Sequence, residues 1–320
     1  MKNYVVAIAA AACLSPALAQ TQWDLPSGYG GNTFQVQNLQ WFADEVGKAT
    51  AGKLKIVVHA NASLFKANEI KRAVQTGQTP AGEFILSGAG NENALFGVDS
   101  VPFLATTYAE SKRLYDVSQP HLEKLLASQG MKLLYTVPWP GQSLYSKEPI
   151  STLADIKGTK MRAYNPTTTR IAELLGAQPV TIQLAELPQA LATGGVNNFL
   201  TSSASGVESK LHEQVKYFYG VSAWLPRNAV VVGIKSFNAL DNATQAAVLK
   251  VAAAAGERGT RISEEKNDAY LKELAAQGMT VDKDGAKLKA ELKTIGAKMI
   301  AEWQLRAGPE GKAIIGAYYK

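Results

Sequence analysis

The stretch that decides the fold runs from Leu153 to Ser205 and reads LADIKGTKMRAYNPTTTRIAELLGAQPVTIQLAELPQALATGGVNNFLTSSAS. Short apolar β runs alternate in it with helical patterns that end at glycine. This βαβαβ order predicts a parallel sheet, and such sheets bind ligands at the carboxyl ends of their strands. In chain order, the predicted elements are a strand at Lys160 to Tyr164, a helix capped by one of Thr167 to Thr169 and ended at Gly176, a strand at Pro179 to Ile182, a helix at about Ala185 to Ala192 and a buried strand at Val196 to Leu200.

Arg162 lies at the carboxyl end of the first of these strands, between Met161 and Ala163. A guanidinium at this position would present a planar fork whose geometry matches a carboxylate. An arginine at a strand edge can equally be solvated, and the pattern alone does not choose between the two. The residues therefore leave an anion site as one of two interpretations.

Three runs around Arg162 resemble the signature region of the substrate-binding proteins of TRAP transporters, the DctP-like family. They are Ile156 to Arg162 (IKGTKMR), Leu175 to Val180 (LGAQPV) and Glu186 to Leu191 (ELPQAL). The resemblance extends over most of the chain after the first residues. It implies a periplasmic solute receptor that holds an organic acid through the arginine at the position of Arg162.

The resemblance also implies the fold class, an α/β protein with two lobes of the periplasmic binding protein type. Each lobe is expected to carry a mixed sheet flanked by helices, and a long helix should brace both lobes. We expect lobe I to comprise residues 20–139 and about 230–256. Lobe II would then comprise residues 140–229 and about 257–320.

The first residues are typical of a secretory signal. Lys2 precedes an apolar segment from Tyr4 to Leu14, and Ala17-Leu18-Ala19 predicts cleavage after Ala19. The segment is too short for a stable membrane-spanning helix. A lipoprotein anchored through Cys13 is the alternative, although the residues before this cysteine lack the usual leucine. We expect residues 1–19 to be removed and the protein to be periplasmic.

Composition argues against several classes of protein. The formal net charge of +6 comes from basic residues interleaved with acidic ones, so no nucleic-acid partner is expected. Cys13 is the only cysteine, and His59, His121 and His212 lack a metal-ligand spacing. We therefore expect no metal, no cofactor and no catalytic residue, and we expect a monomer.

Candidate ligand contacts gather near predicted strand ends. Tyr29 lies in the glycine-rich loop from Ser27 to Asn32, which is either a mobile loop or a ligand contact. Trp139 follows a strand and is either a cleft wall or a buried structural residue. Arg227 is either an anion contact or one member of a surface ion pair. The full candidate set is Trp23, Tyr29, Trp139, Gln142, Arg162, Tyr164, Thr201, Trp224, Arg227 and Asn228.

Gln142 stands close to the position where many members of the family resembled have a second arginine. This difference favours a monocarboxylate whose far end is neutral, and the aromatic candidates favour an aromatic, keto or hydroxy acid. A sugar acid or a C4-dicarboxylate remains the alternative. A secreted enzyme using Glu186 or Asp155 as a general acid, or a structural protein, would be a different class. We expect a receptor that delivers its acid to TRAP membrane subunits.

Overall fold

The computed structural model of the chain describes residues 20–320, which form an α/β protein of two lobes. The predicted signal at residues 1–19, with Cys13, lies outside the described residues. Lobe I has a two-stranded and a three-stranded sheet, lobe II has one six-stranded sheet, and the two larger sheets combine early and late segments of the chain. The predicted α/β class with mixed sheets flanked by helices is confirmed.

Lobe I contains five strands, β1 (Thr21–Pro26), β2 (Leu54–His59), β3 (Ala81–Ile85), β4 (Met131–Pro138) and β10 (Arg227–Gly233). Its helices are α1 (Phe34–Ala49), α2 (Ile70–Gln75), α3 (Tyr108–Ser128) and α7 (Ile234–Asn238), with 3-10 segments η1 (Leu86–Ala89) and η2 (Ala94–Ser100). β1 and β2 pair in parallel, and β10 runs antiparallel between β3 and β4. The chain therefore returns from lobe II to the middle of the three-stranded sheet of lobe I.

Lobe II contains a sheet with the order β11-β9-β5-β8-β6-β7. Its strands are β5 (Ser143–Ser146), β6 (Lys160–Ala163), β7 (Gln178–Thr181), β8 (Asn198–Thr201), β9 (Tyr217–Tyr219) and β11 (Thr280–Asp282). Its short helices are α4 (Pro166–Leu174), α5 (Leu187–Ala192) and α6 (Ser203–Glu208), with 3-10 segments η3 (Leu153–Ile156), η4 (Leu184–Glu186) and η5 (Leu211–Glu213). β6 is parallel to both β7 and β8, which confirms the predicted βαβαβ unit.

The predicted cap of α4 was wrong by two residues or more. Asn165 caps the helix, because its side chain accepts a hydrogen bond from the backbone N–H of Thr168. Pro166 then occupies the first turn, where its missing N–H costs no hydrogen bond. The cap therefore directly follows Tyr164, which places the start of α4 beside the end of β6.

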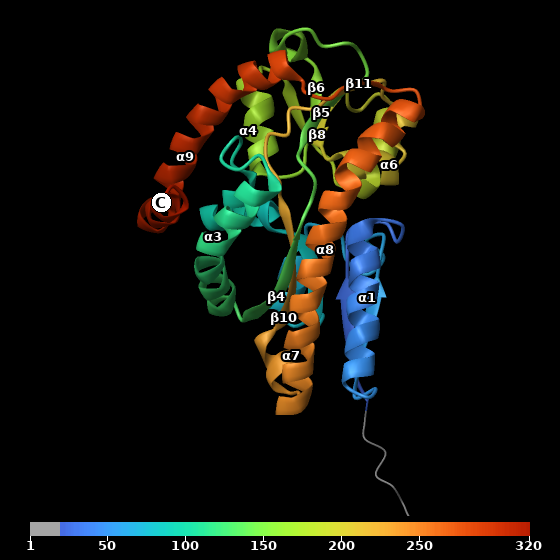
Figure 1. The fold of residues 1–320 in the computed structure, drawn as a ribbon, viewed down its shortest axis with the longest axis vertical. Coiled ribbons are helices and arrows are strands. Elements are labelled where there is room, and N and C mark those ends of the chain that lie inside the picture. Colours follow the sequence, from blue (N-terminus) through green and yellow to red (C-terminus); the bar gives the residue numbers. More distant parts are fainter. Residues whose placement is uncertain (1–19) are drawn as a thin grey trace, which may run out of the picture.

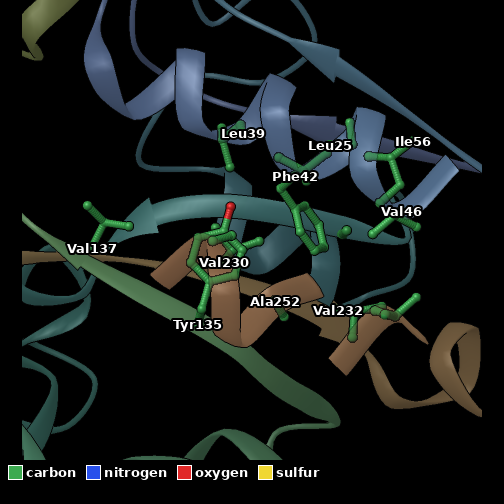
Figure 2. Close-up of a cluster of buried hydrophobic side chains, with 14 of the residues drawn as sticks. Leu25, Leu39, Phe42, Val46, Ile56, Tyr135, Val137, Val230, Val232 and Ala252 are labelled. Carbon is green, nitrogen blue, oxygen red and sulfur yellow. The ribbon is translucent and has the colours of Figure 1, made fainter. Parts of the chain in front are cut away.

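One hydrophobic core of lobe I lies between α1 and the strands of this lobe (Figure 2). Leu39, Phe42 and Val46 are three and four residues apart, so they share one face of α1. The ring of Phe42 lies 5.2 Å from that of Tyr135 on β4. Val230, Val232 and Ala252 complete the same cluster. Burial of this face fixes α1, and with it the loop that joins β1 to α1.

Two long helices connect the lobes (Figure 1). α8 (Asn242–Ala276) has 35 residues and packs against α1 and β4 in lobe I and against α6 and β11 in lobe II. Gly259 permits this contact, because a Cβ there would lie 2.5 Å from a methyl of Val137. α9 (Ala286–Tyr318) bends at Gly308 and ends against α3. The predicted long helix bracing both lobes is confirmed.

Candidate ligand-binding site

A cavity of about 30 Å³ lies between the two lobes, and residues of both lobes line it. The loop after β1, the ends of β3 and β4, and the carboxyl ends of β6 and β8 all contribute to its wall. Its lining residues are Gly28, Tyr29, Ala67, Ile85, Trp139, Gln142, Arg162, Tyr164, Gln183, Leu184, Thr201, Ser205 and Pro226. The cavity therefore lies at the strand ends where the sequence predicted a ligand site.

Arg162 is the charged side chain in the wall of this cavity, and only 3% of it is exposed. Its Nε donates a hydrogen bond of 2.8 Å to the carbonyl of Ile182, and its guanidinium carbon lies 4.8 Å from the centre of the Tyr164 ring. Within residues 20–320, no carboxylate forms an ion pair with it and no group accepts a hydrogen bond from its two Nη atoms.

The environment of Arg162 lowers its pKa to about 10, because burial disfavours the charged form. The charges of Tyr164, Tyr29 and Glu186 act in the opposite direction and raise the pKa. The guanidinium still carries its proton at neutral pH. A buried cation without a counter-ion is costly, and an anionic ligand would remove that cost.

Tyr164 and Gln142 form the neutral side of the cavity. The hydroxyl of Tyr164 donates a 3.1 Å hydrogen bond to Oε1 of Gln142, and Nε2 of Gln142 donates one to the carbonyl of Pro140. Gln142 is 3% exposed, so its amide is held in one orientation by these two bonds. This wall offers dipoles but no second cation.

Tyr29 and Trp139 form an aromatic part of the cavity wall, with ring centres 5.1 Å apart and planes at 54°. Asn228 lies behind them, outside the cavity lining. Its Oδ1 accepts hydrogen bonds from Trp139 Nε1 at 2.8 Å and from the Tyr29 hydroxyl at 3.3 Å. Burial raises the pKa of the Tyr29 phenol, so it remains a neutral donor. Asn228 therefore positions both aromatic rings.

The family model of bacterial extracellular solute-binding proteins, family 7 (DctP), matches residues 28–304 of the chain. That match includes the whole cavity wall. The chain belongs to the DctP family. Its role as a TRAP solute-binding receptor, predicted from the runs around Arg162, is confirmed. Proteins of this family are solute receptors and not enzymes, so the enzyme alternative is set aside.

Solved structures of DctP-family receptors are similar over nearly the whole chain. DctP6 of Bordetella pertussis, which binds pyroglutamic acid, is 48% identical with a TM-score of 0.91, covering 93% of this chain and 99% of its own. A TRAP solute-binding protein from a marine metagenome, specific for pyroglutamate, is 41% identical with a TM-score of 0.92, covering 94% and 99%. A relative found by sequence, the 2,3-diketo-L-gulonate-binding periplasmic protein YiaO of Escherichia coli, is 25% identical, and the match covers 88% of this chain and 87% of YiaO.

The structure of this DctP-family protein brings six of the candidate contacts to the cavity and leaves four outside it. Tyr29, Trp139, Gln142, Arg162, Tyr164 and Thr201 line the cavity. Trp23 points into the lobe I core because it alternates on β1 in step with Leu25. Trp224 is buried in the lobe II core. The third candidate outside the lining is Asn228, which acts from behind the wall, and the fourth is Arg227.

Arg227 faces away from the cavity because neighbouring residues of a strand point to opposite sides, and Asn228 faces the aromatic wall. The guanidinium carbon of Arg227 lies 4.4 Å from the centre of the Tyr115 ring. Its backbone N–H donates to Asp99 Oδ2 at 2.8 Å. This arginine borders a separate cavity of about 20 Å³ inside lobe I. The prediction that it contacts the ligand has no geometric support.

Several lining residues did not appear among the candidates. Gln183 and Leu184 follow β7, the parallel neighbour of β6, so the rule that placed Arg162 at a strand end also points to them. Ser205 belongs to α6, directly after β8. Ala67 and Ile85 give no sequence signal, since small and branched apolar residues are common in any core.

Two further properties of residues 20–320 bear on function. These residues contain no group of three or more His, Cys, Asp or Glu side chains placed to hold a metal ion. No helix in the same range combines the length and apolarity needed to cross a bilayer.

Proposed function

We propose that this receptor captures a small organic monocarboxylate by a charge-assisted contact with Arg162 and delivers it to TRAP membrane subunits. The observation that carries the proposal is the buried guanidinium without a counter-ion in an interlobe cavity. A bidentate carboxylate would satisfy the two free Nη atoms in the geometry that the guanidinium fork prefers. The signal at residues 1–19 would direct the protein to the periplasm, where we expect it to act as a monomer.

We propose pyroglutamate as the leading ligand. Two receptors that bind pyroglutamate are 48% and 41% identical to this chain and match almost all of it. Pyroglutamate is a compact ring with one carboxylate, which matches a wall that holds one cation and the neutral Gln142. The aromatic wall of Tyr29 and Trp139 keeps an aromatic or hydroxy monocarboxylate as the second candidate, because flat rings stack well on such faces.

Competitive calorimetry with four acids tests the ligand class. We expect pyroglutamate to bind most tightly, benzoylformate and glucuronate less tightly, and succinate least. Succinate would bury its second carboxylate without a cation. Saturation at a hundred times Kd should stabilise the protein by about 2.7 kcal/mol, and the acid should be recovered unchanged. Tightest binding by succinate would contradict the proposal.

We further propose that the two lobes expected from the sequence move as units, with the expected boundary at residue 229 moved to 226 so that β10 stays whole. Residues 20–139 and about 227–256 would then move as lobe I, and residues 140–226 and about 257–320 as lobe II. The two crossing segments are joined by backbone hydrogen bonds of 2.8 Å from Trp139 to Pro226, from Gln142 to Trp224 and from Ala223 to Gln142. A paired crossing of this kind can bend as a hinge while the sheets of both lobes stay intact.

Lobe closure should appear in small-angle X-ray scattering. Side chains of both lobes line the cavity, so movement of the lobes toward each other would cover a bound ligand. We expect saturating pyroglutamate to lower the radius of gyration of the protein. An identical scattering profile with and without the acid would contradict the hinge.

A further inference from the structure

A second cavity of about 60 Å³ adjoins the one that contains Arg162. The residues common to both linings are Gly28, Tyr29, Ala67, Ile85, Tyr164 and Gln183. Because they share these walls, the two cavities are neighbouring parts of one region between the lobes. The charged group of the first part is Arg162, which belongs to lobe II. A ligand held at Arg162 can therefore extend toward the second part.

Glu83 borders the second cavity and is 2% exposed. It lies two residues before Ile85 on β3, so both side chains point to the same face of the strand. Its Oε1 accepts a 2.8 Å hydrogen bond from Asn228 Nδ2, and its Oε2 accepts one from the Ser27 hydroxyl. Two carboxylate oxygens can accept about four hydrogen bonds, so capacity for a further donor remains.

Glu83 has no ion-pair partner anywhere in the described part of the chain. The basic group that lines the same cavity, Lys71, is bonded to Glu92 instead. The hydroxyls of Tyr29 and Tyr164 donate to Asn228 and Gln142. These two hydroxyls are thus committed elsewhere, and a buried carboxylate gains from any donor that a ligand brings.

The region consequently holds one buried cation and one buried anion, each without a protein counter-ion among residues 20–320. We propose that Glu83 accepts a hydrogen bond from an N–H group of the ligand and so selects acids that carry such a donor beside the carboxylate. The proposal rests on the proposed function, since it requires the acid to be held at Arg162. It assigns the selection of ligands with an N–H group to a single residue, Glu83. The match to the family model makes no such assignment.

An isosteric pair of acids tests this assignment by isothermal titration calorimetry at pH 8. Burial raises the pKa of Glu83 to about 7, so the carboxylate is mostly ionised at that pH. The probes are pyroglutamate and 3-oxocyclopentane-1-carboxylate, in which a CH₂ replaces the ring N–H. Loss of a hydrogen bond to a charged acceptor should weaken binding of the cyclopentanone by about 10- to 100-fold.

Glu83→Gln should reduce this preference to about fivefold or less, because the amide replaces the charged acceptor. Glu208→Gln is the matched control, since Glu208 is a partly buried carboxylate whose pKa burial also raises to about 7, and it lines neither cavity. The control should keep the full preference. Equal binding of the two acids by the wild type would overturn the inference but not the proposed function. An undiminished preference in Glu83→Gln would remove the assignment to Glu83, and binding of neither acid would overturn both proposals.

Discussion

Replacing Arg162 with alanine should weaken binding of the acid by at least about a hundredfold. The ligand carboxylate would lose a charge-assisted bidentate contact in a desolvated cavity, a loss of at least about 3 kcal/mol. The fold should persist, because within residues 20–320 the side chain of Arg162 donates a single hydrogen bond and forms no ion pair. Removing a buried cation of this kind should leave the thermal stability of the ligand-free protein unchanged or raised. Titration calorimetry and thermal unfolding measure the two effects.

Two further variants separate geometry from charge and from general effects. Arg162→Lys should also bind poorly, because an ammonium does not reproduce the planar fork. Arg170→Ala is the matched control. Arg170 lies nearby on α4, but it is partly exposed and pairs with Glu302 and Glu173. We expect the affinity of Arg170→Ala for the acid to stay within about threefold of that of the wild type. If either Arg162 variant bound the acid with an affinity similar to that of the wild type, the anion contact would lie elsewhere.

The free energy of unfolding should fall as the pH rises from about 5 to 8. Burial raises the pKa of Glu83 and of Glu208 from 4.5 to about 7, and that of Asp99 from 3.8 to about 6. A carboxyl whose folded pKa is raised contributes stability that is complete below its unfolded pKa and is lost as the pH passes its folded pKa. For Glu83, a rise from 4.5 to about 7 corresponds to about 3 kcal/mol.

Urea unfolding at pH 5 and pH 8 measures this dependence. In Glu83→Gln, the fall in the free energy of unfolding between pH 5 and pH 8 should be smaller by about 2 to 3 kcal/mol, because the amide does not titrate. Carboxyls whose pKa is lowered, such as Glu110 and Asp155, lose their contribution mainly below pH 5 and do not cancel the effect. Equal stability of the wild type at both pH values would show that these carboxyls are not desolvated as the structure indicates.

The sequence was most informative where local pattern and topology coincide. Short strands and glycine-ended helices defined the βαβαβ unit, and the strand-end rule placed Arg162, Tyr164 and Thr201 at the cavity. The cap of α4 was misplaced because three consecutive threonines follow Asn165-Pro166, and each is a competent cap. Local sequence does not specify which of several suitable residues takes that position.

The remaining errors concern the direction of side chains. Trp23 and Arg227 lie near strand ends, but each occupies the position of its strand that faces away from the cavity. Their neighbours on the other face cannot be identified without the register of pairing. The contact between Glu83 and Asn228 joins residues 145 positions apart, so neither the carboxylate nor its role behind the aromatic wall was visible in the sequence.

The most direct test of the central claim is a crystal structure of the protein with its bound acid. We predict that the ligand carboxylate will lie within about 3 Å of both Nη atoms of Arg162, between the aromatic wall of Tyr29 and Trp139 and the neutral Gln142. A carboxylate bound at Arg227 or Lys71, with Arg162 making no contact with the ligand, would contradict the account.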